Sequence, residues 1–456
     1  MTYYTKAANL GNLDAVFKLG QLYASSYLVA HNMQKAVEFY KRAADDGHLE
    51  AKRLLVKTYM SGEDIEPDYH KAMQLLQDLV KIKDPTSYYL LGKIYYDGLG
   101  IAPDQLKAIE LYRYGAEAGD PEAQYALGKA YESGRGVSRN IYEACVWYNK
   151  AAEKNHVGSM YQLGYLYRRG IGVNQDFFKA VDYYQKAAMF GCHDAYLELG
   201  HMYESGQGVE RDYAQALNCY KHVAIEGNAE AQNCIGYLYL NMVNSPSSLK
   251  NAFNWFSKSA SLFNAKGCTE LGTMYRDGIG CTQSYEQAIK LYRQAVEQDY
   301  PDAMYCLAKM YEEGIGVKVD YTEAFTYYDL AAKHKHFASM VKVGLMCLKG
   351  IGCSKNIAQS VLMFSLASEA GNPDAQYELA KLYAVGNGVP QDNQQAYIWS
   401  SLALACGKGD SEIAKFRDEI SKNLTTTQLN DAQCETSLYF ENYQNKREHI
   451  IPTTFY

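Results

Sequence analysis

Residues 120–155 read DPEAQYALGKAYESGRGVSRNIYEACVWYNKAAEKN, and their pattern recurs along almost the whole chain. We take Leu127, four residues before Tyr131, as an anchor and count other positions from it. Equivalent apolar anchors follow one another at a constant interval of 36 residues. A fixed period of this length is typical of a stacked array of repeats. The anchors are Leu19, Leu55, Leu91, Leu127, Leu163, Leu199, Ile235, Leu271, Leu307, Val343 and Leu379.

Each period predicts two helices. Asp120 is a strong N-cap residue, and Pro121 suits the first position of a helix. A small residue follows the anchor in ten of the eleven repeats, with Val56 as the exception, and would let a second helix approach closely. The second helix is predicted to follow a residue of N-cap type thirteen positions after the anchor. These residues are Asn32, Asp68, Asp104, Asn140, Asp176, Asp212, Ser248, Ser284, Asp320, Asn356 and Asp392.

Two aromatic positions are predicted to form the core. Four residues after the anchor, tyrosine occurs in ten of the eleven repeats, and Cys347 is the exception. Twenty-one residues after the anchor, nine repeats have Tyr or Phe, whereas Leu76 and Ser400 differ. Such regular positions at helical spacing are most simply explained as core.

The segment SGRGVSRN at 133–140 contains a GxG sequence that is also found in phosphate-binding loops. The GxG sequence occurs eight times at the same place in the period. A phosphate loop lies between one strand and one helix and occurs once per site. Glycine also supplies the left-handed backbone that ends a helix. We therefore expect each GxG to be a turn between two helices.

The composition favours a cytoplasmic protein with no membrane span. The formal net charge of −7 argues against a general nucleic-acid binder. No apolar stretch reaches the roughly 18 residues that suggest a membrane span. The N-terminus also lacks a signal-peptide pattern. The eleven cysteines do not recur as regular pairs, which favours packed thiols in a reducing compartment.

The repeated stretch AEAGDPEAQYALGKAYESGRGVSRNIYEACVWYNKAAEKN resembles the Sel-1-like repeat, a relative of the tetratricopeptide repeat with a longer turn. The resemblance implies an all-α, right-handed superhelical solenoid of eleven 36-residue helix–turn–helix repeats. It also implies a scaffold or adaptor for protein–protein interaction, with no shared catalytic residues. The C-terminal stretch SEIAKFRDEISKNLTTTQLNDAQ is similar to the helical tail of bacterial members.

This pattern divides the chain into three parts. Residues 1–11 are predicted to be a partial repeat with only its second helix. Residues 12–407 hold the eleven repeats, and residues 408–456 form capping helices and a tail. Three turns depart from the pattern, at SSYLVAHN (25–32), SGEDIEPD (61–68) and NMVNSPSS (241–248).

The sequence holds no recognisable catalytic, metal or cofactor motif. None of the ten histidines forms HExxH or a Cys/His metal spacing, and no GxSxG or CxxC occurs. We therefore expect a non-enzymatic scaffold without a cofactor or metal. Three alternatives stay open: a bacterial factor that acts on host proteins, a hydrolase on this scaffold, and a self-assembling array suggested by the partial repeat.

The partner-binding surface is predicted by analogy with the tetratricopeptide repeat, whose first helices line the concave side. Aromatic and arginine side chains dominate many interfaces, and cations suit a partner protein or peptide with acidic groups. In a second interpretation, the tyrosines pack between repeats and the charges are ordinary surface. Glu312 and the 241–248 turn are alternative locations. The predicted surface comprises Tyr89, Lys93, Tyr125, Lys129, Tyr161, Tyr165, Arg168 and Arg169.

Overall fold

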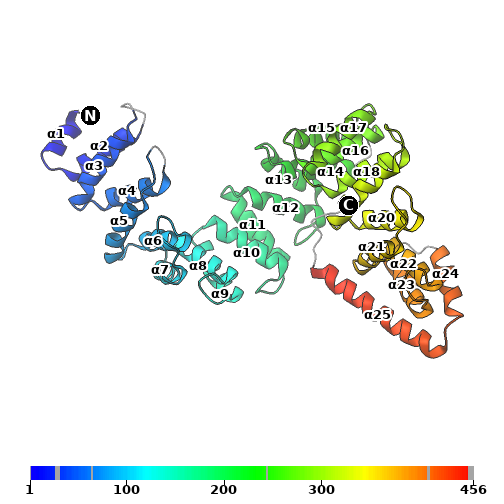
Figure 1. Ribbon diagram of the computed structural model, residues 1–456. Helices are drawn as coiled ribbons and strands as arrows, with labels where there is room; N and C mark the ends of the chain where they lie inside the picture. The colour runs from blue at the N-terminus through cyan, green and yellow to red at the C-terminus, as the bar shows by residue number, and fades with distance from the viewer. Residues whose placement is uncertain (1, 26–30, 63–64, 243–244, 408–410, 450–456) are drawn as a thin grey trace. The chain divides into compact units, whose positions relative to one another are not determined.

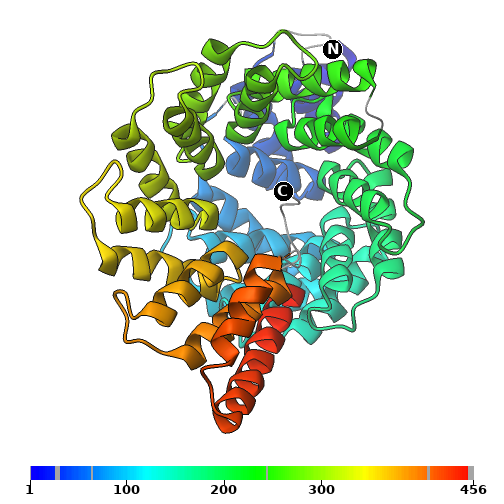
Figure 2. The same ribbon diagram turned by 90° about the vertical axis from the view of Figure 1, so that its right-hand side faces the viewer.

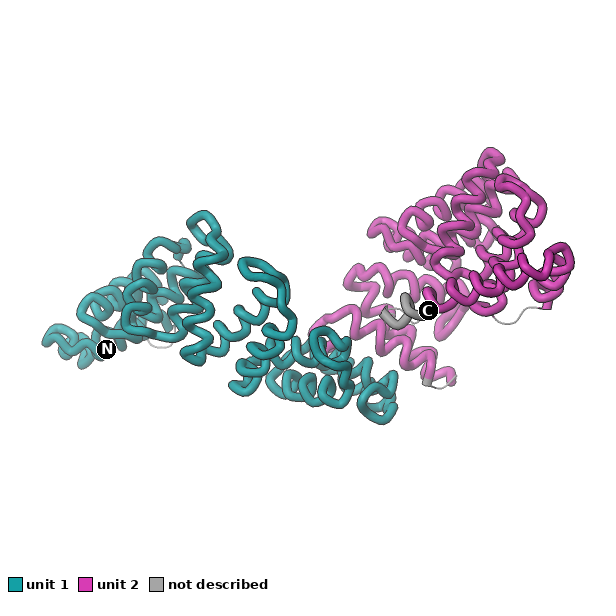
Figure 3. The backbone as a smooth tube through the Cα atoms, turned by 90° about the horizontal axis from the view of Figure 1, so that it is seen from below, with its two compact units in different colours: residues 1–222 teal, residues 223–456 magenta. Residues whose placement is uncertain are grey.

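In the computed structural model of the protein, residues 2–25, 31–62, 65–242, 245–407 and 411–449 are described. All the regular secondary structure in these ranges is α-helical, in 25 helices (Figure 1). The chain falls into unit 1, residues 1–222, and unit 2, residues 223–456 (Figure 3). Each unit is described by itself.

Eleven helix pairs follow the 36-residue period. The first helices of the repeats are α2 (Leu13–Ala24), α4 (Leu49–Ser61), α6 (Pro85–Asp97), α8 (Pro121–Ser133), α10 (Val157–Arg169), α12 (His193–Ser205), α14 (Ala229–Met242), α16 (Ala265–Asp277), α18 (Pro301–Glu313), α20 (Phe337–Lys349) and α22 (Pro373–Val385). The second helices are α3 (Met33–Asp45), α5 (Tyr69–Lys81), α7 (Gln105–Glu117), α9 (Ile141–Ala152), α11 (Phe177–Met189), α13 (Tyr213–Ala224), α15 (Pro246–Ser261), α17 (Tyr285–Val296), α19 (Tyr321–Lys333), α21 (Ile357–Glu369) and α23 (Asn393–Cys406). This arrangement confirms the predicted all-α solenoid of helix pairs.

The predicted N-cap residues, Asp120 and those thirteen positions after each anchor, cap their helices with one exception. Asp120 accepts a hydrogen bond of 2.8 Å from the Ala123 amide at the start of α8. Asn140 accepts one of 3.2 Å from Glu143 at the start of α9. The prediction that Ser248 caps its helix is wrong. Helix α15 begins at Pro246 and is capped by Ser245, because a proline at the first helical position extends the helix by almost one turn.

The GxG segments are helix-to-helix turns. Gly134 ends α8 with a φ of 75°, and Gly136 has a φ of 79°, values that favour glycine. The amide of Asn140 then donates a hydrogen bond of 2.9 Å to the carbonyl oxygen of Tyr131, which closes the turn. The three irregular turns include residues 26–30, 63–64 and 243–244, which lie outside the described residues.

In nine of the eleven repeats, the aromatic residue of the second helix lies in the core. Tyr148 is 0% exposed, and a Cβ atom added to Gly128 would lie 2.6 Å from its ring. The glycine after the anchor therefore makes room for this ring. Apart from Tyr59, which is buried, the tyrosines four residues after the anchor are less buried than predicted. Tyr167, for example, is half-buried and stacks on Tyr183 with ring centroids 5.8 Å apart.

Within each unit, the first helices lie on the inner side of the stack. Some neighbouring first helices contact each other directly: α6 contacts α8 in unit 1, and α16 contacts α14 and α18 in unit 2. Contacts between neighbouring second helices are slighter in the part of the chain that the structure describes. At these places the first helices approach each other more closely than the second helices do, so the first helices face the inner side.

Further helices cover both ends of the repeat array. Helix α1 (Thr2–Asn9) packs on α2, and α24 (Ser411–Ser421) and α25 (Thr426–His449) pack on α23 (Figure 2). The hydroxyl group of Tyr443 in α25 donates a hydrogen bond of 2.9 Å to the carbonyl oxygen of Ser368. Within the described ranges, no helix combines the length and apolar character needed to cross a membrane.

Candidate partner-binding site

The eight predicted site residues lie on three consecutive first helices of unit 1. Tyr89 and Lys93 belong to α6, Tyr125 and Lys129 to α8, and the other four to α10. The 36-residue period therefore brings them into one row on the inner side. Their side chains differ in how far they are exposed and in whether they already have an ion-pair partner.

The tyrosines two residues before each anchor are half-buried in aromatic contacts. Tyr89 lies with its ring centroid 6.0 Å from that of Tyr112. Tyr125 lies 5.7 Å from Tyr148 and 4.6 Å from the ring of His156 in the next repeat. Burial raises the pKa of Tyr89 to about 12. These rings pack within and between repeats, and each keeps an exposed part.

Tyr161 and Tyr165 of α10 are also half-buried. The Tyr161 ring lies 5.7 Å from that of Tyr184, and burial raises the pKa of Tyr161 to about 12. The guanidinium group of Arg169 lies 5.8 Å from the centre of the Tyr165 ring, within reach of a cation–π contact.

The four predicted cations are not equally available. Arg168 forms an ion pair with Glu198 of the next repeat, and its side chain is only 13% exposed. Lys129 is exposed, with its ammonium group 3.3 Å from Glu132. Lys93 is exposed and has no ion pair among the residues that the structure describes. The row is therefore less cationic than the sequence alone suggests.

A polar network beside these residues was missed by sequence reasoning. The hydroxyl group of Tyr148 donates a hydrogen bond of 2.6 Å to Glu132, which lies five residues after the anchor. Gln162 of the next repeat also donates to Glu132, across 3.3 Å. The sequence does contain a signal for this hydrogen bond. Repeats with an acid at this position have tyrosine on the second helix, and the two repeats with leucine there have phenylalanine.

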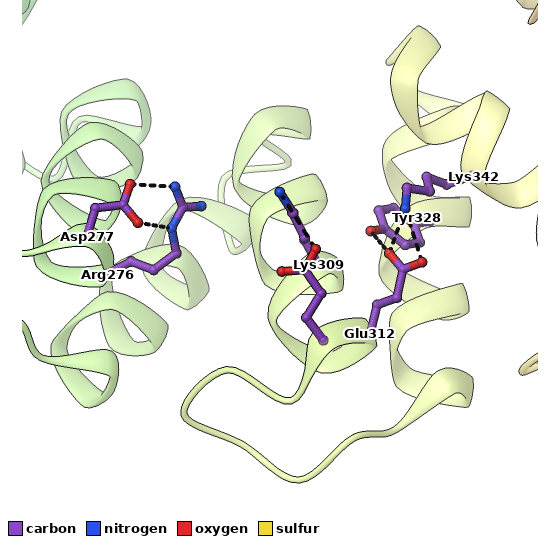
Figure 4. Close-up of polar contacts among 7 residues, drawn as sticks. Arg276, Asp277, Lys309, Glu312, Tyr328 and Lys342 are labelled. Carbon is purple, nitrogen blue, oxygen red and sulfur yellow. Dashed lines mark hydrogen bonds and ion pairs between the residues drawn. The ribbon is translucent and has the colours of Figure 1, made fainter. Parts of the chain in front are cut away.

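Unit 2 repeats this network, as Figure 4 shows. Glu312 accepts a hydrogen bond of 2.6 Å from Tyr328 and bonds of 2.9 and 3.0 Å from the ammonium group of Lys342. In the neighbouring repeat, Arg276 donates two hydrogen bonds of 2.7 Å to Asp277. The alternative acidic site at Glu312 is therefore a carboxylate that already has two partners.

The row combines half-buried aromatic rings with a few cations. In the part of the chain that the structure describes, no three His, Cys, Asp or Glu side chains come together so as to hold a metal ion. Polar side chains in and beside the row pair across repeats, as Arg168 does with Glu198 and Gln162 with Glu132. Such a surface offers aromatic contact area with a polar rim, which suits protein recognition.

Comparison with known proteins agrees with this architecture. The Sel1 repeat family model matches residues 1–12, 13–48, 57–77, 85–120, 121–156, 157–190, 193–222, 229–262, 265–300, 301–336, 338–372 and 373–408. None of the curated proteins compared with the chain matches it.

Two crystal structures are similar over much of their length. A protective antigen present in uropathogenic Escherichia coli strains, which displays an SLR fold, is 29% identical with a TM-score of 0.70. The match covers 100% of this chain and 98% of that one. A Sel1 repeat protein from Oxalobacter formigenes is 30% identical with a TM-score of 0.57, covering 68% of this chain and 90% of that one. The chain therefore belongs to the Sel1 repeat family, whose helix pairs typically serve as protein-interaction scaffolds.

Proposed function

We propose that the chain is a non-enzymatic scaffold that binds a partner protein or peptide along the first helices of unit 1. The observation that carries this proposal is the row formed by α6, α8 and α10. Each helix presents a half-buried tyrosine on the inner side, accompanied by Lys93, Lys129 or Arg169. Rigid aromatic side chains with nearby cations supply much of the binding energy in many interfaces.

The charges of the row favour a partner with acidic groups. Lys93 and Lys129 are exposed, and Arg169 lies against Tyr165 at the half-buried base of the row. Complementary charges raise the rate of association and select the partner. Arg168 is a poor probe of binding, because reversing its charge would break its ion pair with Glu198 and disturb the fold.

Cross-linked capture from lysate of the source cells tests the proposal. The test variant is Lys93→Glu, Lys129→Glu, Arg169→Glu. The matched control is Arg113→Glu, Lys150→Glu, Lys186→Glu, which reverses three exposed cations on the second helices α7, α9 and α11 of the same repeats. Circular dichroism first establishes that all three proteins are equally helical.

A partner captured by the wild type and the control but lost from the test variant would support the row as the binding surface. Capture by all three proteins would support a scaffold but move its site elsewhere. If the wild type captures no partner, the scaffold function fails for that lysate.

A second candidate is a bacterial factor that acts on host proteins through the same row. The observation that favours it is the 29% identity, over the whole chain, to a protective antigen of uropathogenic Escherichia coli. The same three proteins are then tested against host-cell lysate and secretions. A partner found only there, and lost from the test variant, would favour this candidate.

A further inference from the structure

The second repeat departs from the others at two positions that face each other. Val56 replaces the small residue after the anchor, and Leu76 replaces the aromatic residue of the second helix. In other repeats, a Cβ atom on the glycine would lie 2.2–2.8 Å from the aromatic ring. A valine at that place therefore excludes a ring, and Leu76 is the smaller side chain that fits. Both residues are buried, with exposures of 0%.

Without the ring, the inner side of the second repeat differs from that of the other repeats. In other repeats, the tyrosine hydroxyl group reaches side chains of the first helix, as Tyr220 reaches Glu204 across 2.8 Å and Tyr292 reaches Thr273 across 3.0 Å. Leu76 cannot extend this far. A pocket of about 930 Å³ lies at this place, between α4 and α6 and above α5. This volume is in the range of roughly 300–1,000 Å³ that is typical of ligand-binding pockets.

The pocket has an apolar wall and a charged rim. Its accessible wall is formed by the half-buried Leu54, Met60 and Leu90, and the fully buried Val56, Leu76 and Leu79 lie behind them. On the rim, Arg53 is engaged by Asp84 at 2.5 Å and by Glu50 at 3.0 Å.

Two further cations line the pocket, Lys57 from α4 and Lys93 from α6. They lie at the same position of adjacent repeats, two residues after the anchor, and both are exposed. Neither has an ion pair among the described residues. Lys93 also lies near enough to Glu122 to contribute to the lowered pKa of that carboxyl group, which is chiefly due to a hydrogen bond from His156.

We propose that this pocket is the anchor site of the partner: it takes a large apolar side chain of an extended peptide segment whose neighbouring carboxylate lies between Lys57 and Lys93. This inference rests on the proposed scaffold function and names its ligand class. The apolar wall has no polar partner for a charged group, so the carboxylate stays at the lysine rim. Asp97, which also lines the pocket and has no ion pair among the described residues, disfavours a ligand that is anionic throughout.

Other repeats of the chain supply a variant that changes the floor of the pocket. In the two repeats whose first helix has leucine near the ring, at Leu240 and Leu348, the aromatic residue is phenylalanine. Met60 is the apolar equivalent in the second repeat. The variant Val56→Gly, Leu76→Phe, called the filled variant, restores this natural pair. Its ring should reach the floor of the pocket beside Lys57 and Met60, as the rings of other repeats reach the equivalent positions.

Fluorescence anisotropy tests the proposal with three fluorescein-labelled hexapeptides on the full chain. The peptide GEFLEG carries the proposed chemistry, GKFLKG reverses its charge, and GESSEG lacks the apolar anchor. The wild type is expected to bind GEFLEG most tightly. The filled variant should lose at least tenfold in affinity, which corresponds to about 1.4 kcal/mol.

The lysine rim is tested separately. Lys57→Glu, Lys93→Glu should weaken binding of GEFLEG at least tenfold and strengthen binding of GKFLKG. The control Lys81→Glu, Lys107→Glu, on exposed positions of α5 and α7, should change neither. Three results would overturn the proposal: equal affinity of the filled variant, equal affinity for GESSEG, or no binding of any peptide at millimolar concentration.

The lysate capture separates failure of this inference from failure of the scaffold function. If the filled variant captures the same partner as the wild type, the scaffold stands and the pocket is not its anchor site. If the wild type binds GEFLEG but captures no partner, the ligand chemistry of the pocket stands and the scaffold function fails.

Discussion

The hydroxyl group of Tyr148 donates a hydrogen bond of 2.6 Å to Glu132, and the bond ties the second helix of a repeat to its first helix. Tyr328 and Glu312 form the same bond in unit 2, also across 2.6 Å. The aromatic ring fills the core, while its hydroxyl group takes part in the polar network of the inner side. Core packing and the polar network of the inner side are therefore coupled through one side chain.

This coupling predicts non-additive mutations. Tyr148→Phe should cost about 1–2 kcal/mol, because Glu132 loses a hydrogen bond. Glu132→Leu should cost about 1–3 kcal/mol, because a buried hydroxyl group loses its acceptor. The double variant reproduces the Leu–Phe pair of two other repeats and should lie within about 1 kcal/mol of the wild type. Urea unfolding followed by circular dichroism measures all three, and additive losses would contradict the coupling.

A second prediction concerns the fit between the glycine that follows the anchor and the aromatic ring of the second helix. A Cβ atom on Gly344 would lie 2.5 Å from the ring of Phe364. Gly344→Val alone should therefore destabilise the protein by roughly 1–3 kcal/mol through overpacking. Gly344→Val, Phe364→Leu copies the natural pair Val56 and Leu76, and it should recover most of this loss. Thermal unfolding of the single and double variants measures the recovery. A double variant no more stable than Gly344→Val would show that the second repeat depends on other changes.

The parts of the fold that depend on local sequence could be predicted. Asn140 caps its helix and Gly134 ends the preceding one, because capping involves only residues within one turn. The same reasoning failed at Ser248, since Ser245 followed by Pro246 offers an earlier start. The 36-residue period placed the eight site residues in one row. It could not show that Arg168 pairs with Glu198, which depends on how adjacent repeats are offset.

The pocket could not be predicted from the sequence either. Val56 and Leu76 stand out in the sequence as two separate exceptions. The sequence could not show that they face each other beneath the pocket, because that depends on the packing of one helix on another.

The buried carboxyl group of Glu270 predicts a pH dependence. Burial raises its pKa, and the hydrogen bond of 2.8 Å from Tyr237 offsets this only in part. A carboxyl group whose pKa is raised in the folded state favours folding when protonated, so its charge destabilises the protein as the pH rises through that pKa. Glu270→Gln keeps an acceptor for Tyr237 and removes the charge. It should stabilise the protein at pH 7, with the gain disappearing as the pH falls below about 4, the usual carboxyl range. Thermal melts across this pH range test the prediction, with the exposed Glu286→Gln as a control. A gain that is the same at low and neutral pH would exclude the charge as its cause.

The cysteines predict an order of chemical modification. Burial raises the pKa of Cys306 to about 11, so at pH 8 roughly one molecule in a thousand carries the reactive thiolate. Cys434 is the exposed cysteine of α25 and is open to reagent. Iodoacetamide at pH 8 should therefore modify Cys434 in the native protein and leave Cys306 unmodified, as read by mass spectrometry of the peptides. Unfolding in urea should make the two rates similar, since the protection comes from burial. Equal rates in the native protein would show that the repeats around Cys306 open to solvent far more often than their packing implies.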